Sequence, residues 1–560
     1  MLDNYTIADN FSLLAKLMEI HSENSFKAKS FSSAAFTIEK LPVQLKDTAR
    51  DDIFRIKGIG ESTGKGILEM LDTGHFSLLE NYLLKTPAGI LEIMKIKGLG
   101  PKKIATIWKE LEVESMGELL YACNENRLAL LKGFGEKTQE NVKQSINFYL
   151  SNRERFLYAE ILPLAAQLEQ SLQQLLQPAQ VTLTGQIRRQ DIIIDDIALV
   201  AAATPSTLQE KVASLTGLTL STSNDESLTW QHEKGFKVKI YHATNNTFAQ
   251  VLFNTSASGE FLQAVNELLP TADAVYTDEQ AIFSAAGIDY IAPCLREDPN
   301  IITQAASHQL PQLITTADIK GIIHSHSQWS DGLYTLEEMA LAAKEQGFEY
   351  LVISDHSRSA FYANGLSIER IIAQHAQIDS LNQQLAPFRI FKSIEADILN
   401  DGNLDYPDDV LASFDLVIAS VHANLKMPQD KATSRLLKAI EHPHTTILGH
   451  MTGRLLLSRN GYPVDHKAII DACVANQVVI ELNAHPRRLD IDWSWIPYAL
   501  EKGALISIDP DAHSISGYQD IHYGVLAAQK GGLTKERNLS SYSRDMLTDY
   551  LLKRKQSKGY

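Results

Sequence analysis

The segment Gly321-Ile-Ile-His-Ser-His-Ser-Gln-Trp-Ser-Asp-Gly332 joins a short apolar run, typical of a strand, to two histidines and an aspartate. Side chains two positions apart in a strand point to the same face, so we expect His324 and His326 to bind one metal ion together. Asp511 and His513 repeat this ligand-x-ligand spacing further along the chain. The segment therefore predicts a metal-dependent hydrolase domain in the C-terminal part of the chain.

Further candidate ligands follow strand-like apolar runs that lie between these two pairs. Runs such as Tyr350–Ser354, Leu416–Ser420 and Val478–Glu481 alternate with helical stretches, which favours a βα barrel. The C-terminal ends of parallel strands converge on one end of such a barrel, where these folds place active sites. The complete set of candidate metal ligands is His324, His326, Asp331, His356, Glu395, His422, His450, Asp511 and His513.

Composition limits the alternatives. A chain of 560 residues is too long for a single core, so several domains are expected. Its three cysteines are far apart, which argues against a disulfide framework and a thiolate metal site, whereas twelve of its 17 histidines lie after residue 320. No apolar run approaches the roughly 20 residues of a membrane span, and the N-terminus lacks the layout of a signal peptide. We therefore expect a cytoplasmic protein.

A short phrase occurs three times within the first 150 residues. Each copy has an apolar residue, Lys and Gly-x-Gly between two helical runs, and it resembles the helix-hairpin-helix motif of DNA repair proteins. Glycine permits a turn with positive φ, which leaves free N–H groups where a phosphate can dock. The formal charge of −16 disfavours nucleic-acid binding, but charge is nearly balanced over residues 1–150. We predict sequence-independent DNA binding through Gly58, Gly60, Gly98, Gly100, Lys102, Gly133 and Gly135, with functionless helical turns as the alternative.

The segment Thr184-Gly-Gln-Ile-Arg-Arg-Gln-Asp-Ile-Ile-Ile-Asp-Asp-Ile-Ala-Leu-Val200 resembles the nucleotidyltransferase palm of family X DNA polymerases. That family normally has Gly-Ser, two arginines and then Asp-x-Asp. The resemblance keeps Asp196, but Gln186 replaces the serine, Ala198 the second carboxylate and Lys239 the third. Two-metal phosphoryl transfer needs several carboxylates, so we expect Asp196 to be a vestige and DNA polymerase activity to be lost.

From residue 318 onward the chain resembles the polymerase-and-histidinol-phosphatase (PHP) domain. The matching phrases include Ile353-Ser-Asp-His356, Leu448-Gly-His-Met-Thr-Gly-Arg454 and Asp509-Pro-Asp-Ala-His513. The resemblance implies a trinuclear centre in which all nine ligand positions are filled. Imidazole and carboxylate ligands suit Mn²⁺, Zn²⁺ or Fe²⁺, and we favour Mn²⁺.

Further roles follow for residues beside these ligands. Glu395 is expected to bridge two of three divalent metal ions, because a carboxylate offers two oxygens. Arg454 and Arg487, with Arg358 as a third candidate, are expected to clamp the phosphate. Trp329 is a candidate for stacking on a terminal base. Asp355 and Asp509 are expected to orient adjacent ligands.

The sequence thus predicts a multidomain chain acting on DNA. The predicted parts are a helix-hairpin-helix domain over 1–80, helical fingers with further such motifs over 81–153, an α/β palm and thumb over 154–305, a linker over 306–319, and a distorted (βα) barrel of PHP type over 320–560. The resemblances imply a monomeric 3′→5′ exonuclease on gapped, single-stranded or 3′-ended DNA, with 3′-phosphatase and abasic-site endonuclease activities as variants. A small-molecule phosphatase of histidinol-phosphatase type and a non-catalytic DNA-binding scaffold are the alternatives, and no membrane is involved.

Overall fold

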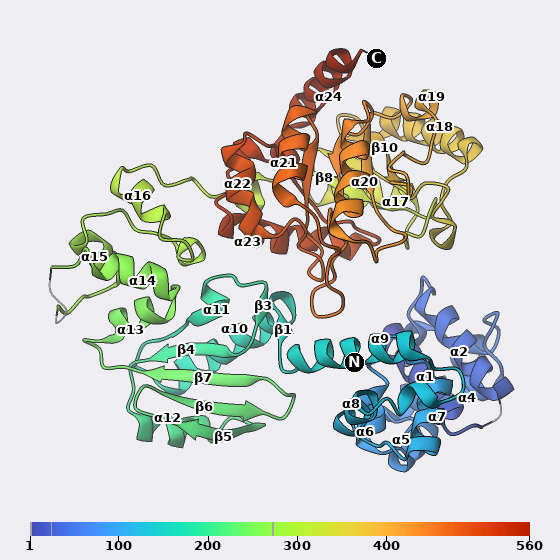
Figure 1. Ribbon diagram of the computed structural model, residues 1–560, viewed down its shortest axis with the longest axis horizontal. Helices are drawn as coiled ribbons and strands as arrows, with labels where there is room; N and C mark the ends of the chain where they lie inside the picture. Colours follow the sequence, from blue (N-terminus) through green and yellow to red (C-terminus); the bar gives the residue numbers. More distant parts are fainter. Residues whose placement is uncertain (1–2, 24, 271–273, 560) are drawn as a thin grey trace. The chain divides into compact units, whose positions relative to one another are not determined.

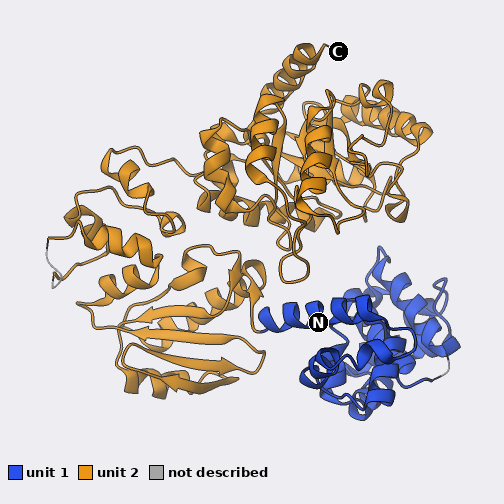
Figure 2. Cartoon of the chain, in the orientation of Figure 1, with its two compact units in different colours: residues 1–153 blue, residues 154–560 orange. Residues whose placement is uncertain are grey.

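The computed structural model describes residues 3–23, 25–270 and 274–559. The chain forms two compact units, Met1–Arg153 and Glu154–Tyr560 (Figure 2). Among the described residues, no helix has the length and apolar character that crossing a membrane requires. The finer domain boundaries stay a prediction.

The first unit is helical (Figure 1). Its α-helices are α1 Asn4–Ile20, α2 Ser25–Glu39, α3 Arg50–Ile53, α4 Glu61–Thr73, α5 Ser77–Lys85, α6 Ala88–Ile93, α7 Pro101–Leu111, α8 Met116–Asn124 and α9 Glu136–Ser151, with 3₁₀ turns η1 Leu45–Asp47 and η2 Leu128–Leu130. One apolar core gathers around Phe11 and Phe31, and a second around Ile104 and Leu119. The unit therefore contains two adjoining helical cores.

The three Gly-x-Gly phrases have the same backbone geometry. The first glycine of each has positive φ, at +97° for Gly58, +91° for Gly98 and +85° for Gly133. The second glycine of each, at positions 60, 100 and 135, directly precedes α4, α7 and α9. Each phrase is thus a left-handed turn that leads into a helix N-terminus, as the sequence predicts.

The middle of the chain has a five-stranded sheet of order β2-β4-β7-β6-β5, in which only β4 and β7 run parallel. Its strands are β2 Val181–Leu183, β4 Ile197–Ala201, β5 Leu218–Ser223, β6 Ser227–His232 and β7 Lys237–His242, and a separate pair joins β1 Phe156–Leu157 to β3 Ile193–Ile194. The helices of this region are α10 Tyr158–Leu175, α11 Gly185–Arg188, α12 Pro205–Val212, α13 Phe248–Thr255, α14 Gly259–Asn266, α15 Glu279–Ala285 and α16 Ile301–Ala306, with the turn η3 Pro293–Leu295.

The C-terminal part is a nearly closed barrel of seven parallel strands that follow one another in sequence order. They are β8 Gly321–Ser325, β9 Tyr350–Ile353, β10 Arg389–Asp397, β11 Leu416–Ser420, β12 Ile447–Leu448, β13 Val479–Asn483 and β14 Ile506–Asp509. A bridge between Ser325 and Ala512 brings the segment after β14 against β8. The expected multidomain class, with helical motifs, an α/β middle and a βα barrel, is confirmed.

Helices follow the strands, as βα connections require (Figure 1). They are α17 Leu336–Glu345, α18 Ile368–Leu385, α19 Asp408–Leu411, α20 Gln429–Glu441, α21 His466–Ala475, α22 Ile496–Glu501, α23 Ile521–Lys530 and α24 Arg544–Lys558, with 3₁₀ turns η4 Thr316–Asp318, η5 Phe361–Ala363, η6 Trp493–Trp495, η7 Ile515–Asp520, η8 Lys535–Arg537 and η9 Leu539–Ser541. Alternate strand residues enter two cores: Ile322 and Leu351 pack with α17, whereas Ile323 and Val352 pack with Leu547 of α24. The strands are therefore apolar on both faces, as in other parallel sheets.

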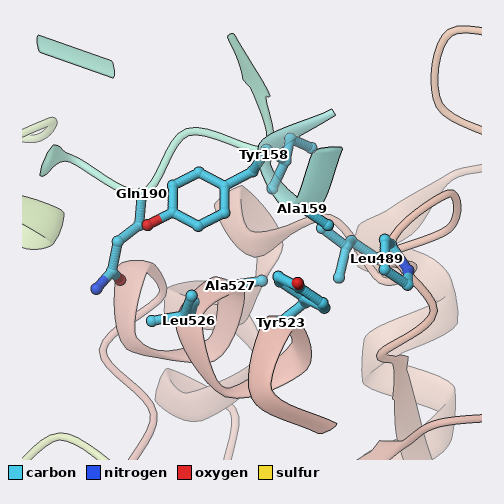
Figure 3. A pocket seen from close by; sticks show the side chains of 9 residues that line it. Tyr158, Ala159, Gln190, Leu489, Tyr523, Leu526 and Ala527 are labelled. Carbon is cyan, nitrogen blue, oxygen red and sulfur yellow. The ribbon is translucent and has the colours of Figure 1, made fainter. Parts of the chain in front are cut away.

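Direct contacts join the palm region to the barrel within the second unit. The Lys530 ammonium, whose side chain is 1 % exposed, lies 2.8 Å from Asp191 Oδ1 and 2.6 Å from Glu297 Oε1. It also donates to the Arg189 carbonyl. A pocket at this interface is lined by residues such as Tyr158 and Tyr523 and by no carboxylate (Figure 3). Ion pairs around the buried Lys530 therefore hold this interface in addition to apolar packing.

Candidate metal centre

The nine predicted ligands gather at the C-terminal ends of the barrel strands. His324 and Glu395 lie within β8 and β10, and the others follow strands β8, β9, β11, β12 and β14. His324 and His326 are completely buried, whereas the side chains of Asp331 and His513 are 36 % and 40 % exposed. The cluster therefore opens to solvent on the side of Asp331 and His513.

Glu395 lies at the centre of the cluster and is buried. One or other of its carboxylate oxygens lies near a ring nitrogen of five histidines, at 3.3 Å from His324, 3.7 Å from His326, 3.0 Å from His356, 3.1 Å from His422 and 3.0 Å from His450. A carboxylate with both oxygens facing imidazoles has the geometry of a group that bridges two cations. This arrangement supports the bridging role predicted for Glu395.

Among the residues that the structure describes, three groups of side chains have potential ligand atoms that lie within 4.8 Å of one another. They are His326, Asp331, His356 and His513; His324, His326 and Asp511; and His356, Glu395 and His422. His326 and His356 each belong to two groups, so the groups adjoin. His450 belongs to none of them, but it reaches the same Glu395 oxygen as His422. The geometry suits several neighbouring metal ions.

Both ligand-x-ligand pairs depart from regular strand geometry. His324 has φ of +61° and Asp511 has φ of +51°, and the pairing of β8 with β9 shifts register between Ile322 and Ser325. We expected regular strand alternation to point both side chains of each pair to the same face. That explanation is wrong, although both pairs do reach the cluster. Left-handed backbone at non-glycine residues costs energy, and it is concentrated at functional sites.

Two buried carboxylates, Glu481 and Asp397, contact histidines of the cluster and orient them. Glu481 Oε1 lies 2.5 Å from His324 Nδ1, and Glu481 Oε2 accepts the His450 backbone N–H at 2.5 Å. Asp397 Oδ1 lies 2.6 Å from His422 Nδ1. Contacts of this kind fix the ring orientation and the tautomer of a metal-binding histidine. Sequence reasoning missed these two carboxylates, although Asp397 ends β10, which also carries Glu395, and Glu481 lies within β13.

The two predicted orienting aspartates are also buried. Asp355 accepts hydrogen bonds from Ser327, Ser330 and Gln374, so it fixes the loop that carries Asp331. Asp509 accepts from the Ser507 hydroxyl at 2.5 Å. Burial, together with the nearby Glu481, raises the pKa of Asp509 well above its usual value. Asp355 thus acts on the loop rather than directly on a histidine ring.

The carboxylates of the cluster raise the pKa values of two of its histidines. Burial opposes protonation of His422, but Glu395 and Asp397 outweigh it and raise the pKa of His422 to about 10. Burial also opposes protonation of His513, and Asp331 and Asp511 raise its pKa to about 9. Metal ions bind neutral imidazole, so binding must release protons from His422 and His513 near neutral pH.

Unsatisfied buried atoms indicate that the residues fit metal ions. Within the described part of the chain, His324 Nε2, His326 Nδ1, His450 Nδ1 and Glu395 Oε2 are buried without a hydrogen-bond partner. Buried polar atoms normally have partners, and a missing ion is one reason for an exception. Imidazole and carboxylate donors suit transition-metal dications, so the donor set fits the predicted Mn²⁺, Zn²⁺ or Fe²⁺.

Neither of the two predicted phosphate-clamping arginines points at the cluster. Arg454 donates to Asp492 at 2.5 Å and to the backbone carbonyls of Arg488 and Leu489. Arg487 lies 3.3 Å from Glu160 of α10. The clamp prediction is corrected for both, because Arg454 braces a loop and Arg487 faces the palm region.

A neighbouring arginine takes the position that the sequence assigned to Arg487. The Arg488 guanidinium Nε lies 3.5 Å from Asp511 Oδ2. Arg358, the third candidate, is paired with Asp405 through its Nε at 3.2 Å. Spacing along the chain could not distinguish Arg487 from Arg488, because a loop rather than a strand carries them.

The Trp329 side chain also makes contacts within the protein. Its indole N–H donates to Gln377 at 2.7 Å, and its ring packs against the barrel core with the Arg370 guanidinium over it at 5.8 Å. Trp329 therefore stabilises the loop between ligands, and a base cannot stack on it without displacing Arg370.

Of the palm residues, Ala198 and Lys239 lie on adjacent strands, and Asp196 directly precedes β4. Ala198 of β4 pairs directly with Lys239 of β7. Burial raises the pKa of Asp196, and the Lys239 charge opposes that shift. Asp195 points elsewhere, toward Arg155 at 2.9 Å and Gln186 at 3.0 Å.

Comparison with known proteins agrees with this arrangement. Residues 2–76 match the family described as helix-hairpin-helix domain, and residues 90–147 match the SAM-like helix-hairpin-helix tandem. The chain is 33 % identical over 550 residues to the DNA polymerase/3′-5′ exonuclease PolX of Bacillus subtilis, covering 95 % of this chain and 96 % of that protein. It is also 24 % identical over 253 residues to a probable phosphatase of Thermoanaerobacter sp., covering 42 % of this chain and 96 % of that one. A probable phosphatase of Escherichia coli is 31 % identical over 170 residues, or 29 % of this chain and 62 % of that one. The chain therefore belongs to the bacterial PolX family of DNA polymerase/3′-5′ exonucleases.

Proposed function

We propose that the chain is a metal-dependent 3′→5′ exonuclease whose reaction takes place in the barrel. The observation that carries this proposal is Glu395, a buried carboxylate surrounded by five histidine rings at the C-terminal end of the barrel. The name of the Bacillus subtilis relative supports the choice of reaction. DNA is the proposed substrate because of the helix-hairpin-helix domains.

The side chains at this centre have different proposed roles. We assign His324, His326, Asp331, His356, Glu395, His422, His450, Asp511 and His513 as ligands of three divalent ions, with Mn²⁺ favoured over Zn²⁺ and Fe²⁺. Burial alone would protonate Glu395, but His422, His324 and His356 keep its pKa well below the usual value, so it stays anionic. When bound, such ions lower the pKa of water and polarise a phosphoester. Arg488 lies close enough to Asp511 to neutralise charge on a bound phosphate.

We infer that the palm region no longer extends DNA. Two-metal nucleotidyl transfer requires several carboxylates around one site. Here a methyl group and an ammonium, on Ala198 and Lys239, stand paired beside Asp196. Gap filling with each of Mn²⁺, Mg²⁺ and Zn²⁺ should therefore yield no extension, whereas extension that Asp196→Ala abolishes would overturn this inference.

The test of the exonuclease uses a 5′-labelled single-stranded oligonucleotide with Mn²⁺. Stepwise shortening from the 3′ end should stop on addition of EDTA and in a Glu395→Ala variant. His442→Ala is a matched control, because His442 is a half-buried histidine paired with Asp408 outside the cluster. Equal shortening by the Glu395→Ala variant would refute the assignment.

A second candidate activity is phosphatase chemistry, which the matches to the two probable phosphatases favour. The same centre would then remove a terminal phosphate, either from a DNA 3′ end or from a small molecule. Cleavage at an abasic site is a further phosphoester hydrolysis that this centre could carry out. Phosphate release from a 3′-phosphorylated oligonucleotide, compared with release from histidinol phosphate, distinguishes these substrates. Release from the small molecule alone would replace the exonuclease assignment.

A further inference from the structure

Two aromatic side chains project from the barrel beside the metal centre. Phe361 is 85 % exposed and Tyr362 is 66 % exposed, and both belong to η5 in the loop that follows His356. The Tyr362 ring centroid lies 6.5 Å from the His356 ring, and the Phe361 ring lies 6.3 Å from the Tyr362 ring. Exposed apolar groups that cluster at one place mark binding surfaces more often than isolated ones do.

The backbone that carries this pair is firmly held. Ala360 and Ala363, on either side of it, are buried. Asp405 accepts the Ser359 N–H at 2.7 Å, and Asp397 accepts the Ser359 hydroxyl at 2.5 Å. The exposure of Phe361 and Tyr362 is therefore not a consequence of a loose loop, and the same Asp397 also contacts the ligand His422.

The pair stands on the open side of the cluster. Asn364, directly after η5, reaches the carbonyls of Trp329 and Ser330 at 3.4 Å, next to the half-exposed ligand Asp331. A substrate that enters beside Asp331 must pass close to Phe361 and Tyr362.

We propose that Phe361 and Tyr362 form the platform on which the unpaired 3′-terminal base of single-stranded DNA stacks. The inference rests on the proposed exonuclease function and identifies the residues that select its substrate. Aromatic side chains bind bases of any identity through their faces, so the platform gives no sequence preference. The Tyr362 ring lies 6.5 Å from the ring of the ligand His356, so a base stacked on it stands beside the metal centre.

A preference for frayed or single-stranded ends follows. In a duplex, a terminal base is stacked on its neighbour and paired with its partner, and moving it onto the protein costs unstacking and unpairing energy. An unpaired or mismatched end avoids most of that cost. The platform therefore makes single-stranded and mismatched 3′ ends better substrates than matched ends.

The test compares 5′-labelled single strands that end at 3′ in either a normal nucleotide or an abasic tetrahydrofuran residue. The unaltered chain should favour the normal end, and Phe361→Ala/Tyr362→Ala should remove this preference by raising KM roughly 5- to 100-fold for the normal end alone. Tyr362→Phe should retain the preference, because the ring remains. Met546→Ala is the matched control, an exposed apolar residue on α24.

Binding without cleavage gives a second measurement. A 3′-terminal 2-aminopurine should lose fluorescence when it stacks on a Glu395→Gln chain, and the loss should disappear when both aromatic residues are also replaced. Unchanged end preference and unchanged quenching in the double variant would overturn the platform. Failure of the unaltered chain to cut any DNA would instead refute the proposed exonuclease, and the quenching experiment would still decide whether the base stacks.

Discussion

Replacing Glu481 by glutamine is expected to weaken metal binding without removing a ligand. The buried Glu481 carboxylate contacts His324 Nδ1 and the His450 backbone N–H, both at 2.5 Å. Glutamine keeps the size of the side chain but loses the charge, so both contacts weaken together. Loss of such an orienting partner typically costs about 10- to 100-fold in metal affinity. This range corresponds to about 1.4–2.8 kcal/mol of binding free energy.

The assay follows exonuclease rate and bound Mn²⁺ as the free Mn²⁺ concentration is raised. For Glu481→Gln, the half-saturating concentration should rise about 10- to 100-fold, while the rate at saturating Mn²⁺ stays within a few-fold of the unaltered chain. Glu501→Gln is the control, because Glu501 lies exposed on α22. An unchanged half-saturating concentration for Glu481→Gln would refute the orienting role, and a lost rate at full occupancy would show that Glu481 takes part in catalysis.

Three further predictions concern pH, the interface between palm and barrel, and DNA binding. The raised pKa of His422, about 10, stabilises the metal-free fold below pH 6.5, and this contribution fades as pH rises toward 10. Since Mn²⁺ competes with the same proton, the rise in Tm that Mn²⁺ produces should grow over this interval, and a shift independent of pH would contradict the assignment. Lys530→Met removes a buried ammonium from Asp191 and Glu297, which stay paired with Arg189, so calorimetry should show the free energy of unfolding lowered by about 1–3 kcal/mol, whereas an unchanged free energy would show that the interface does not depend on this charge. Gly98→Ala strains a backbone with φ of +91° and should weaken DNA binding measured by fluorescence anisotropy, whereas Gly117→Ala within α8 should not; equal affinities would argue against phosphate docking at this turn.

The residue pattern was sufficient to predict the barrel and the elements that carry its site. Apolar runs that end in His, Asp or Glu specify parallel strands whose ends meet, and Glu395 and His450 lie at such ends. The repeated Gly-x-Gly phrases likewise predicted the turns at Gly58, Gly98 and Gly133, because positive φ strongly favours glycine. In both cases a local rule determines the three-dimensional position.

Predictions failed where a loop or a local distortion sets the geometry. Arg487 and Arg488 are adjacent, and only the fold shows that Arg488 faces Asp511. The left-handed backbone of His324 has no signature in the sequence, because positive φ occurs at only a few per cent of non-glycine residues. Phe361 and Tyr362 have no periodic spacing that would mark them as exposed, and their position depends on the buried neighbours that hold η5.

The most direct test of the account measures metal content and DNA cleavage on the same samples. The metal-free chain is loaded stepwise with Mn²⁺, bound metal is counted by mass spectrometry, and shortening of a 5′-labelled single strand is followed at each step. We predict up to three ions per chain, shortening that increases with occupancy, and loss of both metal and cleavage in Glu395→Ala. Cleavage by the metal-free chain, or full occupancy with no cleavage of DNA, would contradict the claim that the buried cluster is the nuclease centre.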